Sequence, residues 1–111
     1  MTGTVMRLEC DKIAKVLLPA IRINIAEEMQ LEYNLSQQEI ADRLGIAQVA
    51  VSKYLNGKYS STVKRMRDYI RDNKLTDNIA RKAAENGKAS DIRDMINELC
   101  TSIAFDGKMS L

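Results

Sequence analysis

The stretch Leu35–Lys58, LSQQEIADRLGIAQVAVSKYLNGK, constrains the fold of this chain more than any other part of it. Ser36 is followed three residues later by Glu39, a capping box that predicts the start of a helix. That helix pattern ends at Gly45, and a second helix pattern begins three residues further on, at Gln48. The stretch therefore predicts two short helices joined by a tight turn.

These two short helices meet the physical requirements of a helix-turn-helix, in which the second helix crosses the first at a steep angle. Ala41 is small where the two helices must approach closely, and Gly45 stands where the turn needs a positive φ. The apolar side chains that fix the crossing angle are Ile40, Leu44, Ile46, Val51 and Tyr54. Each feature is weak alone, but together they predict a helix-turn-helix over about residues 36–57.

The rest of the chain also has helical patterning, with one Pro, five Gly and few β-branched runs. We expect a loose arm over Met1 to about Glu9 and one all-α domain, residues 1–111, of about six helices. This domain would place extra N- and C-terminal helices around the helix-turn-helix, with the C-terminal extension over about residues 74–105. The helices outside the motif are expected from Asp11 to about Tyr33, with Asn34 as a left-handed cap, from a cap at Thr62 to about Asn73, from Leu75 to Asn86, and from a cap at Ser90 onward.

The first of these helices carries an unusual amount of apolar surface. From Val16 to Ala26 the apolar residues lie on almost every side, and such a helix must be buried on most sides. Two alternatives fit this stretch, namely a central core helix and a subunit interface. Pro19 adds a second choice, because it either starts a new helix in its first turn or kinks a single one.

The composition argues against several classes of function. The chain contains no His, no phosphate-binding Gly-rich loop and no nucleophile elbow, so we expect no enzyme, no cofactor and no metal site. Cys10 and Cys100 lack metal-binding spacing and are expected to be small, buried or half-buried residues, with a disulfide between them left open. No apolar run is long enough for a membrane span and no signal peptide is evident, so we expect a cytoplasmic, nucleoid-associated protein.

Gln37 to Gly57 resembles the lambda-repressor-like (Cro/repressor, XRE-type) helix-turn-helix family in its ordered Gln, Ala, Gly, Gln, Val and Asn-Gly positions. With the preceding segment LPAIRINIAEEM, the stretch looks like the DNA-binding module of archaeal predicted transcriptional regulators. The resemblance covers about residues 10–60. It implies that the second helix, about Gln48 to Asn56, enters the major groove of double-stranded DNA.

The residues of the second helix agree with this implication. If Val51, Tyr54 and Leu55 face inward, then the side chains of Gln48, Val49, Ser52 and Lys53 lie on the opposite surface. Gln can pair with adenine, Val can touch a thymine methyl group, and Lys can reach guanine or a phosphate. The helix N-terminus near Gln37 and the segment after the second helix are natural phosphate contacts. The expected DNA-binding residues are Gln37, Ala47, Gln48, Val49, Ser52, Lys53, Asn56, Lys58 and Tyr59. Arg43 either faces the DNA or is a solvated charge.

The charge distribution supports a nucleic-acid partner. Residues 36–71 contain seven Lys and Arg against three acidic residues, whereas residues 1–35 and 72–111 each contain one more acidic than basic residue. A basic centre of this kind is typical of phosphate binding. Lys64, Arg65, Arg67 and Arg71 either extend the backbone contacts or form the solvated side of a helix.

These observations predict a sequence-specific DNA-binding transcriptional regulator that acts as a homodimer, because one recognition helix reads only a few base pairs. The dimer is expected to form through the N-terminal helix, Val16 to Met29, and also through the C-terminal stripe Ile92–Ile103. The alternative is a protein-interaction module, such as an antitoxin or adaptor, that uses the same scaffold and has little affinity for DNA.

Overall fold

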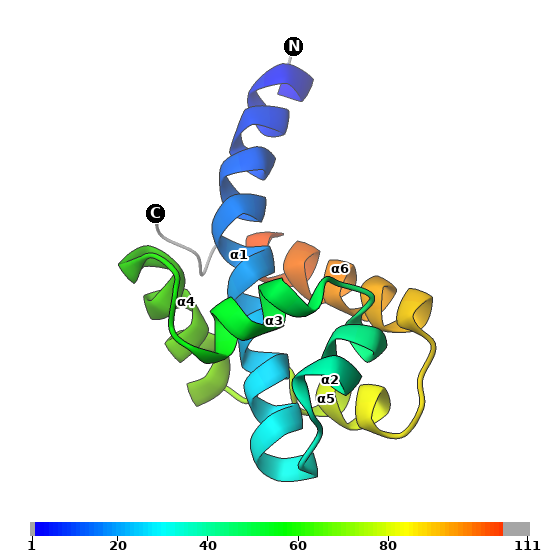
Figure 1. Ribbon diagram of the computed structural model, residues 1–111. Helices are drawn as coiled ribbons and strands as arrows, with labels where there is room; N and C mark the ends of the chain where they lie inside the picture. Colours follow the sequence, from blue (N-terminus) through cyan, green and yellow to red (C-terminus); the bar gives the residue numbers. More distant parts are fainter. Residues whose placement is uncertain (1, 106–111) are drawn as a thin grey trace.

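The computed structural model describes residues 2–105, and it describes side chains for residues 15–104. Every regular element in this range is a helix (Figure 1). The helices are α1 (Thr2–Tyr33), α2 (Gln37–Leu44), α3 (Gln48–Leu55), α4 (Ser61–Asp72), α5 (Asp77–Ala84) and α6 (Ala89–Phe105). The expected all-α fold with a helix-turn-helix core is confirmed.

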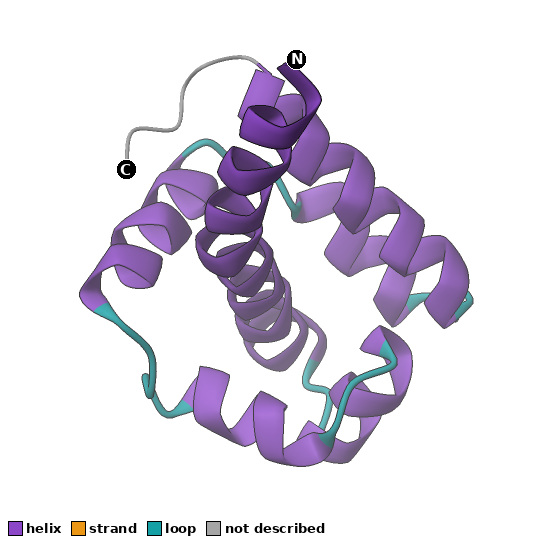
Figure 2. Cartoon of the chain, turned by 90° about the horizontal axis from the view of Figure 1, so that it is seen from above, coloured by secondary structure: helices purple, strands orange, loops and turns teal. Residues whose placement is uncertain are grey.

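Helix α1 is the central element of the fold, and the other helices surround it (Figure 2). Leu17, Ile23 and Met29 lie on different sides of α1, and all three are inaccessible to solvent within a single chain. Of the two alternatives for this stretch, the central core helix is therefore correct. The expected dimer surface at Val16 to Met29 is wrong for the same reason, because most of its apolar area is already covered by α3, α4, α5 and α6.

The start of α1 also differs from expectation. The helix begins at Thr2, so the expected loose arm over Met1 to Glu9 is wrong from Thr2 onward, and the N-terminal turns extend beyond the other helices (Figure 1). The same helix continues through Pro19 without a break. Proline removes one backbone hydrogen bond, to the carbonyl four residues earlier. That carbonyl belongs to Lys15, which is exposed, so water can satisfy it.

Helix ends follow the local signals in most places. Ser36 Oγ accepts from the backbone N–H of Glu39 at 3.1 Å, and the Glu39 carboxylate accepts from the Ser36 N–H at 3.1 Å, which completes the expected capping box. Asn34 and Gly45 adopt the left-handed conformation with φ of 55° and 67°. These residues confirm the expected ends of α1 and α2 and the tight turn before α3.

Two expected N-caps are wrong. Ser60, not Thr62, caps α4, because its Oγ accepts from the Val63 N–H at 3.2 Å and thereby places Thr62 inside the helix. Ser90 also lies inside a helix, because α6 already begins at Ala89. In both places neighbouring small polar residues offer more than one possible start, and the packing of the following apolar residues selects among them.

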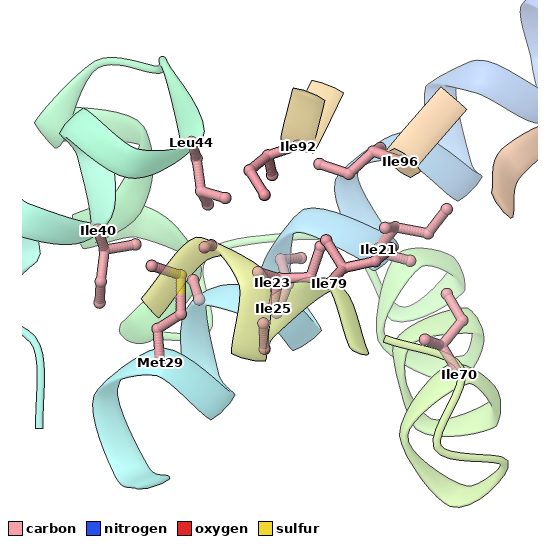
Figure 3. Packing of buried hydrophobic residues seen from close by; sticks show 14 of the residues in the cluster. Ile21, Ile23, Ile25, Met29, Ile40, Leu44, Ile70, Ile79, Ile92 and Ile96 are labelled. Atoms are coloured by element: carbon pink, nitrogen blue, oxygen red, sulfur yellow. The ribbon is translucent and has the colours of Figure 1, made fainter. Parts of the chain in front are cut away.

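The core joins the helix-turn-helix to the rest of the molecule (Figure 3). Side chains from α2, α4, α5 and α6 converge on the buried side chains of α1. The labelled residues are Ile21, Ile23, Ile25, Met29, Ile40, Leu44, Ile70, Ile79, Ile92 and Ile96. Helices α5 and α6 therefore share a core with the motif, and the orientation of α2 and α3 depends on all of the other helices.

Candidate nucleic-acid interface

Helix α3 has one buried and one exposed side. Val51 is fully buried against the core, whereas the expected reading residues Gln48, Val49 and Lys53 are exposed and Ser52 is partly exposed. Val49 is 66% exposed, which makes it one of two large hydrophobic side chains left open to solvent among the described residues. An exposed helix surface of this kind can contact base edges through hydrogen bonds and apolar contacts. Figure 1 shows α3 at the surface, with no other helix in front of it.

The N-terminus of α3 is open. Ala47 is the N-cap and is exposed, and it makes no side-chain hydrogen bond to the first turn. Because a methyl group cannot accept a hydrogen bond, the first N–H groups of α3 are left for water or an anion. The small side chain also permits close approach of another molecule to this end of the helix.

The C-terminus of α3 is tightly fixed. Gly57 has a φ of 70°, its N–H donates to Tyr54 O at 3.3 Å, and the Lys58 N–H donates to Lys53 O at 2.9 Å. This pair of bonds is a Schellman motif, which ends the helix. The backbone N–H of Lys58 is therefore already hydrogen-bonded within the protein. Asn56 Nδ2 donates to Ser52 O at 2.8 Å. Any phosphate contact by Lys58 must therefore come from its exposed ammonium group, and Asn56 offers mainly its carbonyl oxygen.

Gln37 lies at the first position of α2 and is half-buried. It shares this helix end with the Glu39 carboxylate, whose pKa is lowered by the hydrogen bonds from the Ser36 backbone and side chain and by the charge of Arg43. An ionised carboxylate at a helix N-terminus competes with a phosphate for the same N–H groups. Gln37 is thus the least favourably placed of the expected phosphate contacts.

The basic residues of the central segment separate into two groups. Arg43 donates to two carbonyl oxygens at the end of α5, so it is neither an open DNA-facing charge nor a solvated one. Arg67 is only 8% exposed and is held between Glu27 and Asp68, and Arg71 lies 3.4 Å from Asp68. Four other cations are exposed and make no ion pair with the described residues. They are Lys53, Lys58, Lys64 and Arg65, called here the open basic group.

Tyr59 has a contact that sequence patterns did not predict. Its hydroxyl oxygen accepts a hydrogen bond from Arg67 Nη1 at 3.3 Å, and the same nitrogen lies 2.9 Å and 3.0 Å from the two carboxylate oxygens of Glu27. Burial tends to lower the pKa of Arg67, but the hydrogen bond and charge of Glu27, with smaller contributions from the Asp68 hydrogen bond and from Tyr59, outweigh it and raise that pKa. Glu27 and Arg67 are 40 residues apart, and neither local spacing nor helix periodicity links them.

The described residues form neither a cluster of metal ligands nor a membrane-spanning helix. Within the described part of the chain, no three His, Cys, Asp or Glu side chains gather as metal ligands, and no helix is long and apolar enough to cross a membrane. Cys100 is half-buried as expected. The side chain of Cys10 lies outside the described residues, so its pairing stays a prediction.

A tight helical pair with an open second helix and a fixed C-terminal loop defines a helix-turn-helix protein. Residues 25–71 match the family model described as Helix-turn-helix, so this part of the chain is similar to helix-turn-helix domains of the lambda-repressor-like, XRE type. Domains of this class are DNA-binding regulatory modules rather than enzymes. Among curated proteins and among solved structures, none matches the chain closely enough to add a relative.

Proposed function

We propose that the protein is a sequence-specific transcriptional regulator that inserts α3 into the major groove of double-stranded DNA. One observation carries the proposal. Gln48, Val49 and Lys53 are exposed together on a short helix whose opposite side is fixed in the core by Val51. A rigid helix with a polar and apolar reading surface can recognise base edges, since its side chains need little reordering on binding.

The proposed contacts divide into base contacts and backbone contacts. Gln48 pairs with an adenine, Val49 packs against a thymine methyl group, and Lys53 reaches a guanine or a phosphate. Ala47 and Ser52 lie at the same surface and permit close approach. Lys58 and the partly exposed Tyr59 bind phosphates beside the groove, together with the less favourably placed Gln37. Asn56 donates to Ser52 and presents an acceptor oxygen, so it faces the DNA without binding a phosphate. The open basic group then accounts for the salt dependence of binding.

We also propose that the protein binds DNA as a homodimer, and that it is located in the cytoplasm in association with the nucleoid. A single helix of this length reads few base pairs, so two copies on half-sites about 34–36 Å apart would be needed for useful specificity. The apolar side of α6 remains partly open at Met95 and Leu99, which line a hollow of about 260 Å³ with Leu75. This part of α6 is the surface that we propose for the second copy.

Selection of bound duplexes from a random DNA pool tests the proposal directly. We expect enrichment of a palindrome and binding that weakens steeply with salt. On the selected duplex, Gln48→Ala should weaken binding by roughly 5- to 150-fold, the range for a lost bidentate base contact. Lys53→Glu should weaken it further by repelling the phosphates.

Matched controls are available on exposed positions away from α3. Gln30→Ala on α1 and Lys82→Glu on α5 change the same residue types and should leave binding within about 2-fold, since neither lies on the proposed surface. No enrichment from the pool would contradict the proposal and favour the protein-interaction module. Equal losses in the controls and in the α3 variants would also contradict it.

A further inference from the structure

The connection between α3 and α4 is anchored along its whole length. The Schellman bonds fix Gly57 and Lys58 to the end of α3, and Ser60 caps the start of α4. Between them, the Tyr59 N–H donates to Gly57 O at 3.0 Å, which fixes the backbone of this residue. Only the side chain of Tyr59 still needs an orientation, and Arg67 supplies the single hydrogen bond that its hydroxyl makes to the described residues.

The positive charge of Arg67 is already compensated by carboxylates within the protein, so it attracts DNA only weakly. Its Nη1 group bonds both carboxylate oxygens of Glu27, and its Nε and Nη2 groups lie 2.8 Å and 2.7 Å from Asp68 Oδ1. Two carboxylates therefore compensate one buried guanidinium. Such a group is suited to holding neighbours in place rather than to attracting phosphates.

We infer that Arg67 is a positioning residue, which holds the Tyr59 hydroxyl so that this hydroxyl donates its own proton to a DNA phosphate beside the recognition helix. The inference rests on the proposed function. A tyrosine hydroxyl that accepts a hydrogen bond keeps one O–H to donate, so Arg67 and a phosphate oxygen can both be satisfied. Accepting from a cation also polarises the hydroxyl and strengthens it as a donor.

A phosphate contact through the Tyr59 hydroxyl differs from a direct phosphate contact by Arg67 in its effect on the salt dependence of DNA binding. A neutral hydroxyl displaces no counterion from DNA, whereas each Lys or Arg that neutralises a phosphate contributes about 0.9 to the slope of log affinity against log salt. Loss of the Tyr59 contact should therefore weaken binding at every salt concentration by the same factor. Loss of a charged contact should change the slope.

Fluorescence anisotropy with the selected duplex, over a series of salt concentrations, tests the inference. Tyr59→Phe should weaken binding by roughly 2- to 10-fold with an unchanged salt slope, as expected for one neutral hydrogen bond. Arg67→Met should give a similar loss and the same slope. The double variant should be no weaker than the weaker single variant, because both changes remove one contact. Lys58→Met should instead flatten the slope by about 0.9.

The controls separate this inference from folding effects and from the proposed function. Tyr69→Phe on α4 removes a hydroxyl that makes no hydrogen bond to the described residues and should bind like the unmodified protein. If Arg67→Met does not fold in a thermal melt, Arg67→Lys keeps the charge but not the planar geometry, and it should lose the same affinity. Wild-type affinity in Tyr59→Phe, additive losses in the double variant, or a slope that flattens by about 0.9 in the Arg67 variant would overturn the inference. Absence of DNA binding by the unmodified protein would instead overturn the proposed function.

Discussion

Arg43 Nη1 lies 2.6 Å from the carbonyl oxygen of Ala83, and the same nitrogen donates to the next carbonyl, of Ala84, at 3.0 Å. Both carbonyls belong to the last turn of α5, where the helix itself provides no donors. The guanidinium of α2 therefore completes the end of α5 and joins the helix-turn-helix to the C-terminal part of the molecule.

Replacing this arginine should destabilise the whole protein. Arg43→Met keeps the aliphatic stem but removes both hydrogen bonds, and we expect a loss of about 1.5–3 kcal/mol in the free energy of unfolding, as for hydrogen bonds to charged groups. Urea unfolding followed by circular dichroism measures it. Arg81→Met, at an exposed position on α5, should change stability by less than about 0.5 kcal/mol. Equal stability of both variants would contradict this assignment.

Glu28 should make stability depend on pH near neutrality. Its carboxylate accepts hydrogen bonds from Thr76 Oγ1 and from Asn24 Nδ2, beside a hollow of about 390 Å³. Burial, together with the hydrogen bond and charge of Asp77 and the charge of Glu32, raises the pKa of Glu28 from 4.5 to about 7, against the lowering effect of Thr76. The folded state therefore binds this proton more tightly than the unfolded state does.

Because the pKa of Glu28 is higher in the folded state than in the unfolded state, the protein should be more stable at low pH than at high pH. The stabilisation by protonated Glu28 is fully present below pH 4.5 and is lost as the pH rises through about 7. Glu28→Gln cannot titrate and should reduce the fall in unfolding free energy between pH 5 and pH 8, as measured by urea unfolding at each pH. Glu85→Gln, an exposed control, should keep the wild-type dependence. The prediction fails if the two variants show the same dependence.

The serine of the α2 capping box should contribute more to the free energy of unfolding than an exposed serine inside a helix does. Ser36→Ala removes the acceptor for the Glu39 N–H and should cost about 1 kcal/mol in thermal or urea unfolding. Ser90→Ala tests the corrected start of α6, because Ser90 lies inside that helix and is exposed. It should change stability by less than about 0.5 kcal/mol, and a loss equal to that of Ser36→Ala would show that Ser90 is a cap after all.

Substitution of Gly57 and of Gly87 by alanine should destabilise the protein for different reasons. At Gly57 a Cβ would meet nothing within 4 Å, so Gly57→Ala carries only the cost of a positive φ, roughly 1–2 kcal/mol. At Gly87 a Cβ would lie 2.9 Å from the carbonyl oxygen of Lys82 and 3.2 Å from Ile92 Cδ1. Gly87→Ala must shift backbone and should cost about 1–3 kcal/mol through overpacking, although its φ is not positive. Crystal structures of the two variants should show displacement only around residue 87.

Local signals predicted most of the fold. Ser36 with Glu39, Asn34 and Gly45 each determine a helix end through bonds to residues a few positions away, so the chain itself displays the pattern. The apolar excess of α1 indicated deep burial, but its covering could not be assigned, because a second copy and the rest of the same chain would bury it equally well. Only the packed structure distinguishes the two.

The polar contacts between distant helices could not be predicted in this way. Arg43 and Arg67 look alike in sequence to the open basic group, yet one binds the end of α5 and the other binds α1. Which cation is buried depends on long-range geometry that neither periodicity nor charge counts contain. The exposure of Gln48, Val49 and Lys53 was predictable because the inward side of α3 is set by its own apolar spacing. What these side chains bind stays a prediction.

The central position of α1 also has a consequence for how the protein is made. This helix leaves the ribosome before every element that covers it, and residues 17–29 include apolar side chains on nearly every side. Helix α6, which completes the covering, follows about 70 residues later, roughly 4–15 s at ordinary rates of synthesis. During that interval the nascent chain exposes a segment with apolar side chains on nearly every side, so productive folding depends on keeping that segment from aggregating until α6 is complete.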